Sequence, residues 1–488
     1  MEFQTSHLRS TLIGASIANL YERLGWNVVR MNYLGDWGKH IGLLACGWQR
    51  FGSEETFQKD PMHHLSDVYH QIGELFKPEQ EASKAAKNEN KDSAEVESQG
   101  IYAERDAFFK KMEDGDADAM ALSQRFRNAT VDYYKSGYAK LGIEFDEYSG
   151  ESQVSHESVS VVETVLRDKG VCEESEGSWI INFAKHDAKG LGVAMMRYRN
   201  GTTSYLLRDV AAVLDRDAAF SFDKMIYVVA MEQDNHFGRV IKTLQLMGNE
   251  ELAQKLQHVN FARVTGVPDQ LKSARLLTDY LDGCRAIMQE RMPADMPDGE
   301  TEEESAETNG VGDDAQNDER FVPRSEDAIN GLALSALIIQ DVGRKKSGSY
   351  NLDAKHMTSF DGETGPAFQN CYCRLLTVLK QGGFTASSDE DYSTLDCSPL
   401  EARRYGDVLR VMSQYPAAVA SMYRNLEPSS VTAFVSRLVE QVTFALDDDA
   451  EDDQADDGLP ARMALYENAR QVLENALRLL GVAPLSLE

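Results

Sequence analysis

The stretch KMIYVVAMEQDNHF, Lys224–Phe237, places an apolar run directly before a polar one. Its first half is short, apolar and rich in β-branched and aromatic residues, a pattern that predicts a buried strand. Polar side chains follow Ala230, where that strand should end, and the carboxyl ends of parallel strands are where doubly wound α/β folds bind ligands. The stretch therefore predicts an α/β domain with a binding site beside the end of this strand.

The segments on either side repeat the alternation of helix and strand. HLRSTLIGASIANLYERLGW, His7–Trp26, has apolar residues at helical spacing and a glycine near its end, so it predicts a helix. Strand patterns recur in four further segments, which are NVVRMNY (27–33), SWIINF (178–183), TSYLLRD (203–209) and HVNFARV (258–264). Helix, tight turn and parallel strand in succession predict a doubly wound sheet.

The rest of the chain divides into an insertion, a linker and a helical part. A highly charged helical pattern predicts a helical insertion of about residues 42–190. Ten acidic residues and no basic residue lie in Pro297–Glu319, which predicts a disordered linker over 297–324. Amphipathic helices dominate beyond it. We therefore expect a sheet domain over 1–296 and an α-helical bundle over 325–488.

The charge of the chain is uneven. Its 488 residues carry a formal net charge of −30, which argues at first against nucleic acid, because phosphate contacts need Lys and Arg. The acidic tracts Pro297–Glu319 and Asp447–Asp457 supply 18 of those excess charges, and both have the composition of solvated loops. The folded surface should be much less acidic than the total, so a nucleic-acid partner is compatible with the composition.

The sequence also indicates where in the cell the protein is located and whether its cysteines bind a metal. No apolar run approaches the ~18 residues that cross a bilayer, and the start at Met1 lacks a charged-then-apolar signal pattern. The six cysteines are scattered, and the one close pair, Cys371 and Cys373, has no second pair at zinc spacing. We expect a soluble intracellular protein with reduced, mostly buried thiols, no membrane segment and no resident metal.

Six blocks in collinear order resemble arginyl-tRNA synthetase, a class I enzyme, over nearly the whole chain. They are HLRST (7–11), MNYLGDWGKHIGLL (31–44), YLLRDVAAVLDR (205–216), YVVAMEQDNHF (227–237), MTSFDGETGP (357–366) and ALYENARQVLENALRLLGV (464–482). The resemblance implies a Rossmann-like nucleotide-binding parallel sheet that activates arginine with ATP. It also implies an all-α anticodon-binding bundle at the C-terminus.

The resemblance places an ATP site at two loops, and both depart from the family. The class I signature is His-x-Gly-His, and the matching tetrad here ends in Ser6 and His7, so one histidine is retained. His7 is implied as catalytic and, with Ser6, as ATP-binding; a histidine near a helix cap can also be purely structural. The second signature loop corresponds to Gly266–Lys272, where Asp269 would repel phosphates and Lys272 is a candidate donor.

The arginine-binding residues of the family are matched more closely in this sequence than its ATP loops. The resemblance assigns Tyr205, Asp209 and Gln233 to the arginine substrate. Tyr205 and Asp209 are four residues apart and share a face if the segment is helical, and a carboxylate matches the planar fork of a guanidinium. The alternative is that Asp209 caps a helix and Tyr205 fills the core.

The C-terminal half offers candidate tRNA contacts. Gln369 and Arg374 lie in GETGPAFQNCYCR, which matches a family pattern with one aromatic replaced. Tyr466 and Arg470 match a face implied to contact the anticodon loop, where an aromatic ring could stack on an unpaired base. A buried core role for Tyr466 is the competing interpretation.

The resemblance implies an arginine–tRNA ligase that uses ATP, with Mg²⁺ bound to it, and tRNA(Arg). Family members carry a strand with Glu-Phe-Ser-Ser-Pro-Asn ahead of the first signature, and this sequence starts after that point, which we interpret as an N-terminal truncation. With both ATP loops altered, the alternative is a catalytically impaired paralogue that binds arginine, tRNA or a protein without turnover. We expect a monomer in the cytoplasm, with a mitochondrial location left open.

Overall fold

The computed structural model describes residues 5–88, 94–292, 321–383, 395–450 and 459–487. The chain forms two compact units, each described here by itself. The first is Val29–Asn260, and the second combines Gln4–Val28 with Phe261–Glu488. The predicted linker lies mostly outside the described residues, so the domain boundaries given above stay predictions.

The first unit contains three small sheets. Strands β1 (Met31–Leu34) and β2 (Glu147–Gly150) pair in parallel, with Met31 opposite Glu147. A three-stranded antiparallel sheet and a further strand pair complete the set, which consists of β3 (Cys172–Ser175), β4 (Ser178–Asn182), β5 (Val193–Arg197), β6 (Met225–Ala230) and β7 (Leu256–Phe261). The parallel pair and β6 confirm the α/β prediction. The segment SWIINF is a strand as predicted, but in an antiparallel sheet.

A block of helices is inserted between β1 and β2. It comprises α2 (Lys39–Phe51), α3 (Glu54–Lys59), α4 (Pro61–Asn88), α5 (Ala94–Glu97), α6 (Gly100–Glu113) and α7 (Ala117–Lys140). Leu43, Ile72 and Phe76 belong to its apolar core, as the helical spacing of apolar residues requires. The charged helical pattern that begins near residue 42 is thus confirmed.

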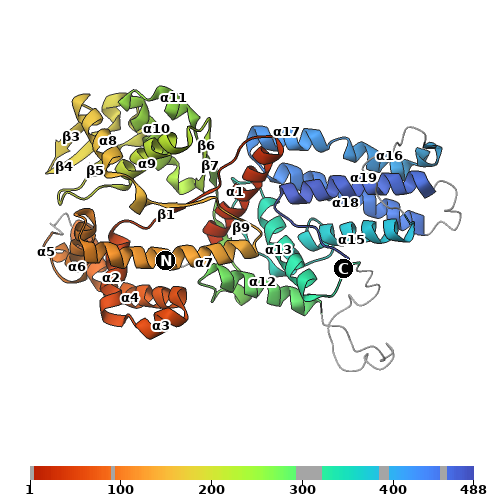
Figure 1. The fold of residues 1–488 in the computed structure, drawn as a ribbon, viewed down its shortest axis with the longest axis horizontal. Helices are drawn as coiled ribbons and strands as arrows, with labels where there is room; N and C mark the ends of the chain where they lie inside the picture. Colours follow the sequence, from red (N-terminus) through yellow and green to blue (C-terminus); the bar gives the residue numbers. More distant parts are fainter. Residues whose placement is uncertain (1–4, 89–93, 293–320, 384–394, 451–458, 488) are drawn as a thin grey trace. The chain divides into compact units, whose positions relative to one another are not determined.

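Four more helices pack with the antiparallel sheet in the first unit. They are α8 (His156–Asp168), α9 (Tyr205–Phe220), α10 (Asp234–Met247) and α11 (Glu250–Lys255) (Figure 1). The strand predicted for TSYLLRD is wrong, because Ser204 caps a helix that starts at Tyr205 and its hydroxyl accepts a hydrogen bond from the Leu207 amide. An apolar run this short is compatible with either a strand or the start of a helix. The Ser204 cap favours the helix.

The second unit is mainly helical. It contains α1 (Thr5–Arg23), the short parallel strands β8 (Val264–Gly266) and β9 (Tyr350–Asn351), α12 (Leu277–Arg291), α13 (Glu326–Val342), α14 (Ala354–Met357), α15 (Gly365–Gln381), α16 (Arg403–Met412), α17 (Tyr415–Asn425), α18 (Ser429–Ala450) and α19 (Leu459–Leu479). Helices α15, α18 and α19 lie side by side (Figure 1), which confirms the predicted bundle. The segment HVNFARV is not one strand, because β7 ends at Phe261 and β8 begins at Val264.

A buried arginine organises the start of the second unit. Arg9 of α1 is fully buried, and its guanidinium donates hydrogen bonds to the carbonyl oxygens of Ala262 (2.7 Å), Gly348 (2.9 Å) and Lys345 (3.0 Å). Asp341 lies 3.7 Å from it. Burial raises the pKa of Asp341 to about 6, and the nearby guanidinium opposes that rise. One side chain thus joins α1, the lead into β8 and the turn before β9.

We expect Arg9→Met to destabilise the protein by about 3–5 kcal/mol, because it leaves Asp341 buried without its cation and three carbonyl groups without their donor. Urea denaturation followed by fluorescence measures the loss. Arg403→Met is the control, because the Arg403 side chain is 94% exposed and such a change should cost less than about 0.5 kcal/mol. Equal stability of the two variants would show that the Arg9 contacts contribute little.

Candidate functional site

Two of the residues predicted to bind arginine lie on one face of α9. Tyr205 begins the helix and Asp209 follows one turn later. Asp209 does not cap the helix, because Ser204 does, and Tyr205 is half exposed rather than part of the core. The Tyr205 hydroxyl lies close to Gly38, because a Cβ atom added to Gly38 would be 3.0 Å from the hydroxyl oxygen. The positive φ of Gly38 also favours glycine at this position. The structure therefore excludes capping by Asp209 and core filling by Tyr205, and the arginine-binding role of the pair stays a prediction.

The Asp209 carboxylate is contacted from two other elements of the first unit. The Tyr33 hydroxyl of β1 donates to Oδ1 at 3.1 Å, and Nε2 of His236 in α10 lies 2.6 Å from Oδ2. The Arg216 guanidinium lies 4.3 Å from the centre of the Tyr33 ring. Burial and the Asp209 charge raise the pKa of Tyr33, so its hydroxyl keeps the proton that it donates.

A second acid, Glu151, belongs to this site. It directly follows β2 in a short 3₁₀ turn, Glu151–Gln153, and it is 9% exposed. Its Oε2 atom has no hydrogen-bond partner among the described residues. Burial, with the negative charges of Asp209 and Asp36, raises the pKa of Glu151 to about 9. Asp36 already has Arg127 as an ion-pair partner at 2.8 Å, whereas Glu151 has no ion pair among the described residues.

Sequence reasoning missed Glu151, Tyr33 and His236. The position of Glu151 and Tyr33 in the sheet could have identified them. Both lie at or next to the carboxyl ends of two parallel strands, where such folds bind ligands. His236 stands in the polar run after β6 that the sequence already marked. Gln233, the residue predicted there, is exposed at the N-cap of α10, three residues before His236, and makes no side-chain cap hydrogen bond.

The residues predicted to bind ATP belong to the second unit. Ser6 and His7 are in the first turn of α1, and the His7 side chain is exposed. Nζ of Lys272 is 2.5 Å from Asp269, and both side chains are largely exposed. The one candidate cation in that loop is therefore shared with a carboxylate of the same loop.

The residues predicted to contact tRNA all have partners within the second unit. Gln369 is fully buried, donates to the Ala483 carbonyl at 2.8 Å and accepts from the Leu485 amide at 3.0 Å. Tyr466 is 1% exposed and donates to Asp449 at 2.6 Å. In this conformation both residues stabilise the bundle, and their contact with tRNA stays a prediction.

The two predicted tRNA-binding arginines are paired with acids. Arg374 forms an ion pair with Asp447, and Arg470 bonds to Glu467 (2.7 Å) and Glu474 (2.5 Å). The first part of the acidic tract is therefore not a solvated loop, because Asp447 lies in α18 and neutralises a basic side chain. Residues 451–457 of that tract lie outside the described residues.

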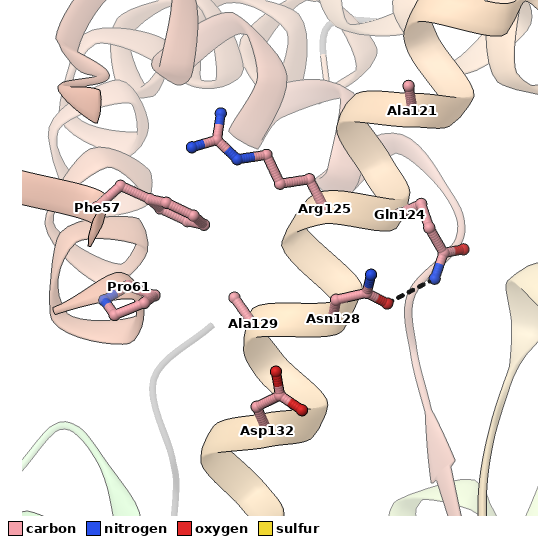
Figure 2. Close-up of a pocket in the computed structure, with 8 residues that line it drawn as sticks. All are labelled: Phe57, Pro61, Ala121, Gln124, Arg125, Asn128, Ala129 and Asp132. Atoms are coloured by element: carbon pink, nitrogen blue, oxygen red, sulfur yellow. Dashed lines mark hydrogen bonds between the residues drawn. The ribbon is translucent and has the colours of Figure 1, made fainter. Parts of the chain in front are cut away.

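The helical insertion carries a surface pocket of about 480 Å³. Figure 2 shows Phe57 and Pro61 on one side of it and α7 on the other, with Arg125 at one end. Gln124 and Asn128 of α7 are hydrogen-bonded to each other at 2.7 Å. None of the residues that line it belongs to the arginine site, so this pocket does not define the candidate function.

The described residues contain no cluster of three or more His, Cys, Asp or Glu side chains that could hold a metal ion. Within that same part of the chain, no helix is long and apolar enough to cross a membrane. All six cysteines are free thiols, and four of them are buried (Cys46, Cys284, Cys371 and Cys373). The prediction of mostly buried thiols is confirmed, and their reduced state stays a prediction.

Two family models match the chain. The catalytic domain of class I (R) tRNA synthetases matches residues 1–353, and the DALR anticodon binding domain matches residues 368–486. The cytoplasmic arginine–tRNA ligase of Saccharomyces cerevisiae is 37% identical over 482 residues, which cover 99% of this chain and 74% of the relative. The mitochondrial arginine–tRNA ligase of the same yeast is 35% identical, and the match covers 99% of this chain and 69% of the relative.

Solved structures agree on the fold. Thermus thermophilus arginyl-tRNA synthetase superposes with a TM-score of 0.72 at 17% identity, covering 99% of this chain and 80% of that one. The Plasmodium falciparum enzyme gives a TM-score of 0.69 at 18% identity, with 99% and 74% covered. The matches in both domains and the identity to these relatives confirm the resemblance found in the six sequence blocks, and the chain belongs to the class I arginyl-tRNA synthetase family.

Proposed function

We propose that this protein is an arginine–tRNA ligase, which activates arginine with ATP and transfers the arginyl group to tRNA(Arg). The observation that carries the proposal is the pair of acids Asp209 and Glu151 beside the exposed Tyr205. Asp209 is anchored by two donors, and Glu151 is buried with an oxygen that has no partner among the described residues. A planar cation with several N–H donors complements both carboxyl groups.

The ion pairing of Arg208 is compatible with a cationic ligand. This buried arginine lies 3.5 Å from Glu113 and therefore already has a carboxylate partner. It donates to the backbone carbonyl of Glu151 rather than to the carboxyl group. A guanidinium that entered beside Glu151 would favour its ionised form, because an opposite charge stabilises a carboxylate that burial has kept neutral.

ATP would be bound in the second unit, with His7 as the catalytic residue and Ser6 and Lys272 as further contacts. Exposure of His7 in the first turn of α1 supports this role, since amide groups at a helix start favour phosphate. Mg²⁺ would enter bound to ATP, as the class I synthetase family implies. Catalysis would rest on positioning and on donors aimed at the phosphates.

The remaining assignments are proposals of the same kind. Gln369, Arg374, Tyr466 and Arg470 would contact tRNA(Arg) after exchanging some of their present partners for phosphate or base groups, and Gln233 would complete the arginine pocket. We further propose a monomer located in the cytoplasm; the relatives include both cytoplasmic and mitochondrial ligases.

A second candidate function is arginine binding without turnover. The observation that favours it is the ion pair of Lys272 with Asp269 in the loop that should contact phosphates. Loss of one effective phosphate donor typically costs about 10²–10³ in rate. The two candidates share the arginine pocket and differ in whether ATP is consumed.

Calorimetry and aminoacylation of tRNA(Arg) together test the proposal. Arginine should bind, and Asp209→Asn should weaken binding by about 1.5–3 kcal/mol, the range for hydrogen bonds to charged groups. Asp217→Asn is the matched control on the same helix, because Asp217 makes only a half-exposed contact with Lys255. The ligase proposal predicts transfer of labelled arginine to tRNA. Binding without transfer would favour the second candidate, and no binding would refute both.

The raised pKa of Glu151 also predicts a pH-dependent stability. Its folded-state pKa of about 9 exceeds its ordinary value of 4.5. The neutral Glu151 carboxyl therefore makes its full contribution to the free energy of unfolding below about pH 4.5, and this contribution is lost as the pH rises toward 9. Between these values the folded state prefers the protonated acid, and an uncharged isostere should stabilise it.

We expect Glu151→Gln to stabilise the arginine-free protein by about 3 kcal/mol near pH 7. The gain should vanish below about pH 5. The same variant should bind arginine more weakly, because an amide cannot form an ion pair. Urea denaturation at several pH values measures the first effect and calorimetry the second. The exposed Glu157 provides a control, as Glu157→Gln. If the free energy of unfolding of Glu151→Gln varied with pH in parallel with that of the parent chain, the raised pKa of Glu151 would be contradicted.

A further inference from the structure

An exposed aromatic surface lies where α1 ends beside α17 in the second unit. Trp26 and Tyr423 are 40% and 38% exposed, although both rings pack against the buried ring of Tyr21, with centres 5.5 Å and 5.4 Å from it. Leu24, two residues before Trp26, is also exposed. Figure 1 shows α1 and α17 side by side. We call Leu24, Trp26 and Tyr423 the aromatic surface.

The backbone at the end of α1 holds Trp26 in this place. Gly25 has a φ of 88°, the left-handed conformation that commonly terminates helices. The Trp26 amide then donates to the Tyr21 carbonyl at 3.0 Å, which brings the Trp26 ring back against Tyr21 and leaves part of it in solvent. Apolar side chains that gather at one exposed place are typical of binding surfaces.

Two arginines flank the aromatic surface. Arg23 precedes Leu24 at the end of α1, and Arg424 follows Tyr423 in the last turn of α17. Burial raises the pKa of Tyr415, the first residue of α17, and the Arg23 charge opposes that rise, which places Arg23 near α17. Both arginines are exposed, and neither forms an ion pair or a side-chain hydrogen bond with another residue that the structure describes.

The neighbouring acids and carbonyl groups do not cancel this positive charge. Glu22 has a partner of its own, and Glu427 accepts a hydrogen bond from the Lys346 amide at 3.0 Å. The Lys346 ammonium group donates to carbonyl groups at the C-terminal end of α17. In contrast, Arg374 and Arg470, which were predicted to contact tRNA, are both paired with acids. The second unit thus has unpaired cations beside the aromatic surface.

This combination of side chains fits RNA that has unpaired bases. A guanidinium group matches the geometry of a phosphate, and aromatic side chains stack on bases that are not paired. A protein partner could also cover the apolar side chains. Arginines without ion pairs on both sides of them favour a polyanion instead.

We propose that the aromatic surface, with Arg23 and Arg424, binds an unpaired segment of tRNA(Arg). A base stacks on Trp26 or Tyr423, and the two guanidinium groups contact the phosphates beside it. This inference rests on the proposed function, because it takes tRNA(Arg) as the partner. It adds a contact surface to the residues of the helical bundle that were predicted to contact tRNA.

The binding of a labelled tRNA(Arg) transcript to the full chain tests the stacking. Trp26→Leu keeps apolar packing against Tyr21 but removes the large ring, and Tyr423→Ala removes the second ring. Each change should weaken tRNA binding about fivefold or more. Phe220→Ala is the control, because Phe220 is a 39% exposed aromatic residue of the first unit. Unchanged tRNA affinity in both test variants would overturn the proposal.

The salt dependence of binding tests the arginines separately. Arg23→Gln and Arg424→Gln should each reduce the slope of log affinity against log salt concentration by about 0.7, because each removes one phosphate contact to a single strand. Lys59→Gln removes an exposed cation that is paired with Glu55 and should leave the slope as in the parent chain. Slopes that stay the same in all three variants would exclude the phosphate contacts.

Hydroxyl-radical footprinting of the parent chain needs no variant and therefore does not depend on variant folding. Bound tRNA should protect Trp26 and Tyr423 from oxidation and leave Phe220 unprotected. Binding of tRNA without this protection would refute the surface alone. If the parent chain bound no tRNA, the ligase proposal would fail, and this inference with it. Calorimetry with L-arginine should give the same affinity for the parent chain and the four test variants.

Discussion

The burial of the Arg208 guanidinium is the constraint on which the proposed arginine site depends. This side chain is 3% exposed, and it donates to the carbonyl oxygen of Glu151 through Nε (3.1 Å) and Nη2 (2.9 Å). Its Nη1 atom contacts Thr203, and its charge lies 3.5 Å from Glu113. A buried guanidinium must keep its donors and its charge satisfied, so these groups from α6, α9 and the turn after β2 cannot move independently.

This constraint fixes Asp209 and Glu151, the two acids of the proposed arginine site, relative to each other. Asp209 is the next residue of α9, and Glu151 is held through its own backbone carbonyl. The Glu113 carboxylate also accepts from Trp37 (2.7 Å) and Thr203 (2.6 Å), which ties the helical insertion to the same cluster. The insertion thus contributes to the geometry of the arginine site although none of the predicted arginine-binding residues lies in it.

The sequence predicted those features whose signals are local. The strand over Met225–Ala230 and the one-turn spacing of Tyr205 and Asp209 follow from patterns within a few residues. The strand is half-buried rather than buried as predicted. Glu151 could not be found in this way, because its segment has no clear period and the residue that positions it, Arg208, is 57 positions away. The strand predicted at TSYLLRD failed for the opposite reason, since one serine cap outweighed the apolar pattern.

We propose above that Asp209 and Glu151 recognise the positive charge of arginine through their two carboxyl groups. Calorimetric titration with L-arginine and with L-citrulline tests it most directly, because citrulline has nearly the same shape and no charge. The account predicts that arginine binds at least about a hundredfold more tightly, as expected when a desolvated carboxylate loses its charged partner. Equal affinity for the two amino acids would contradict it.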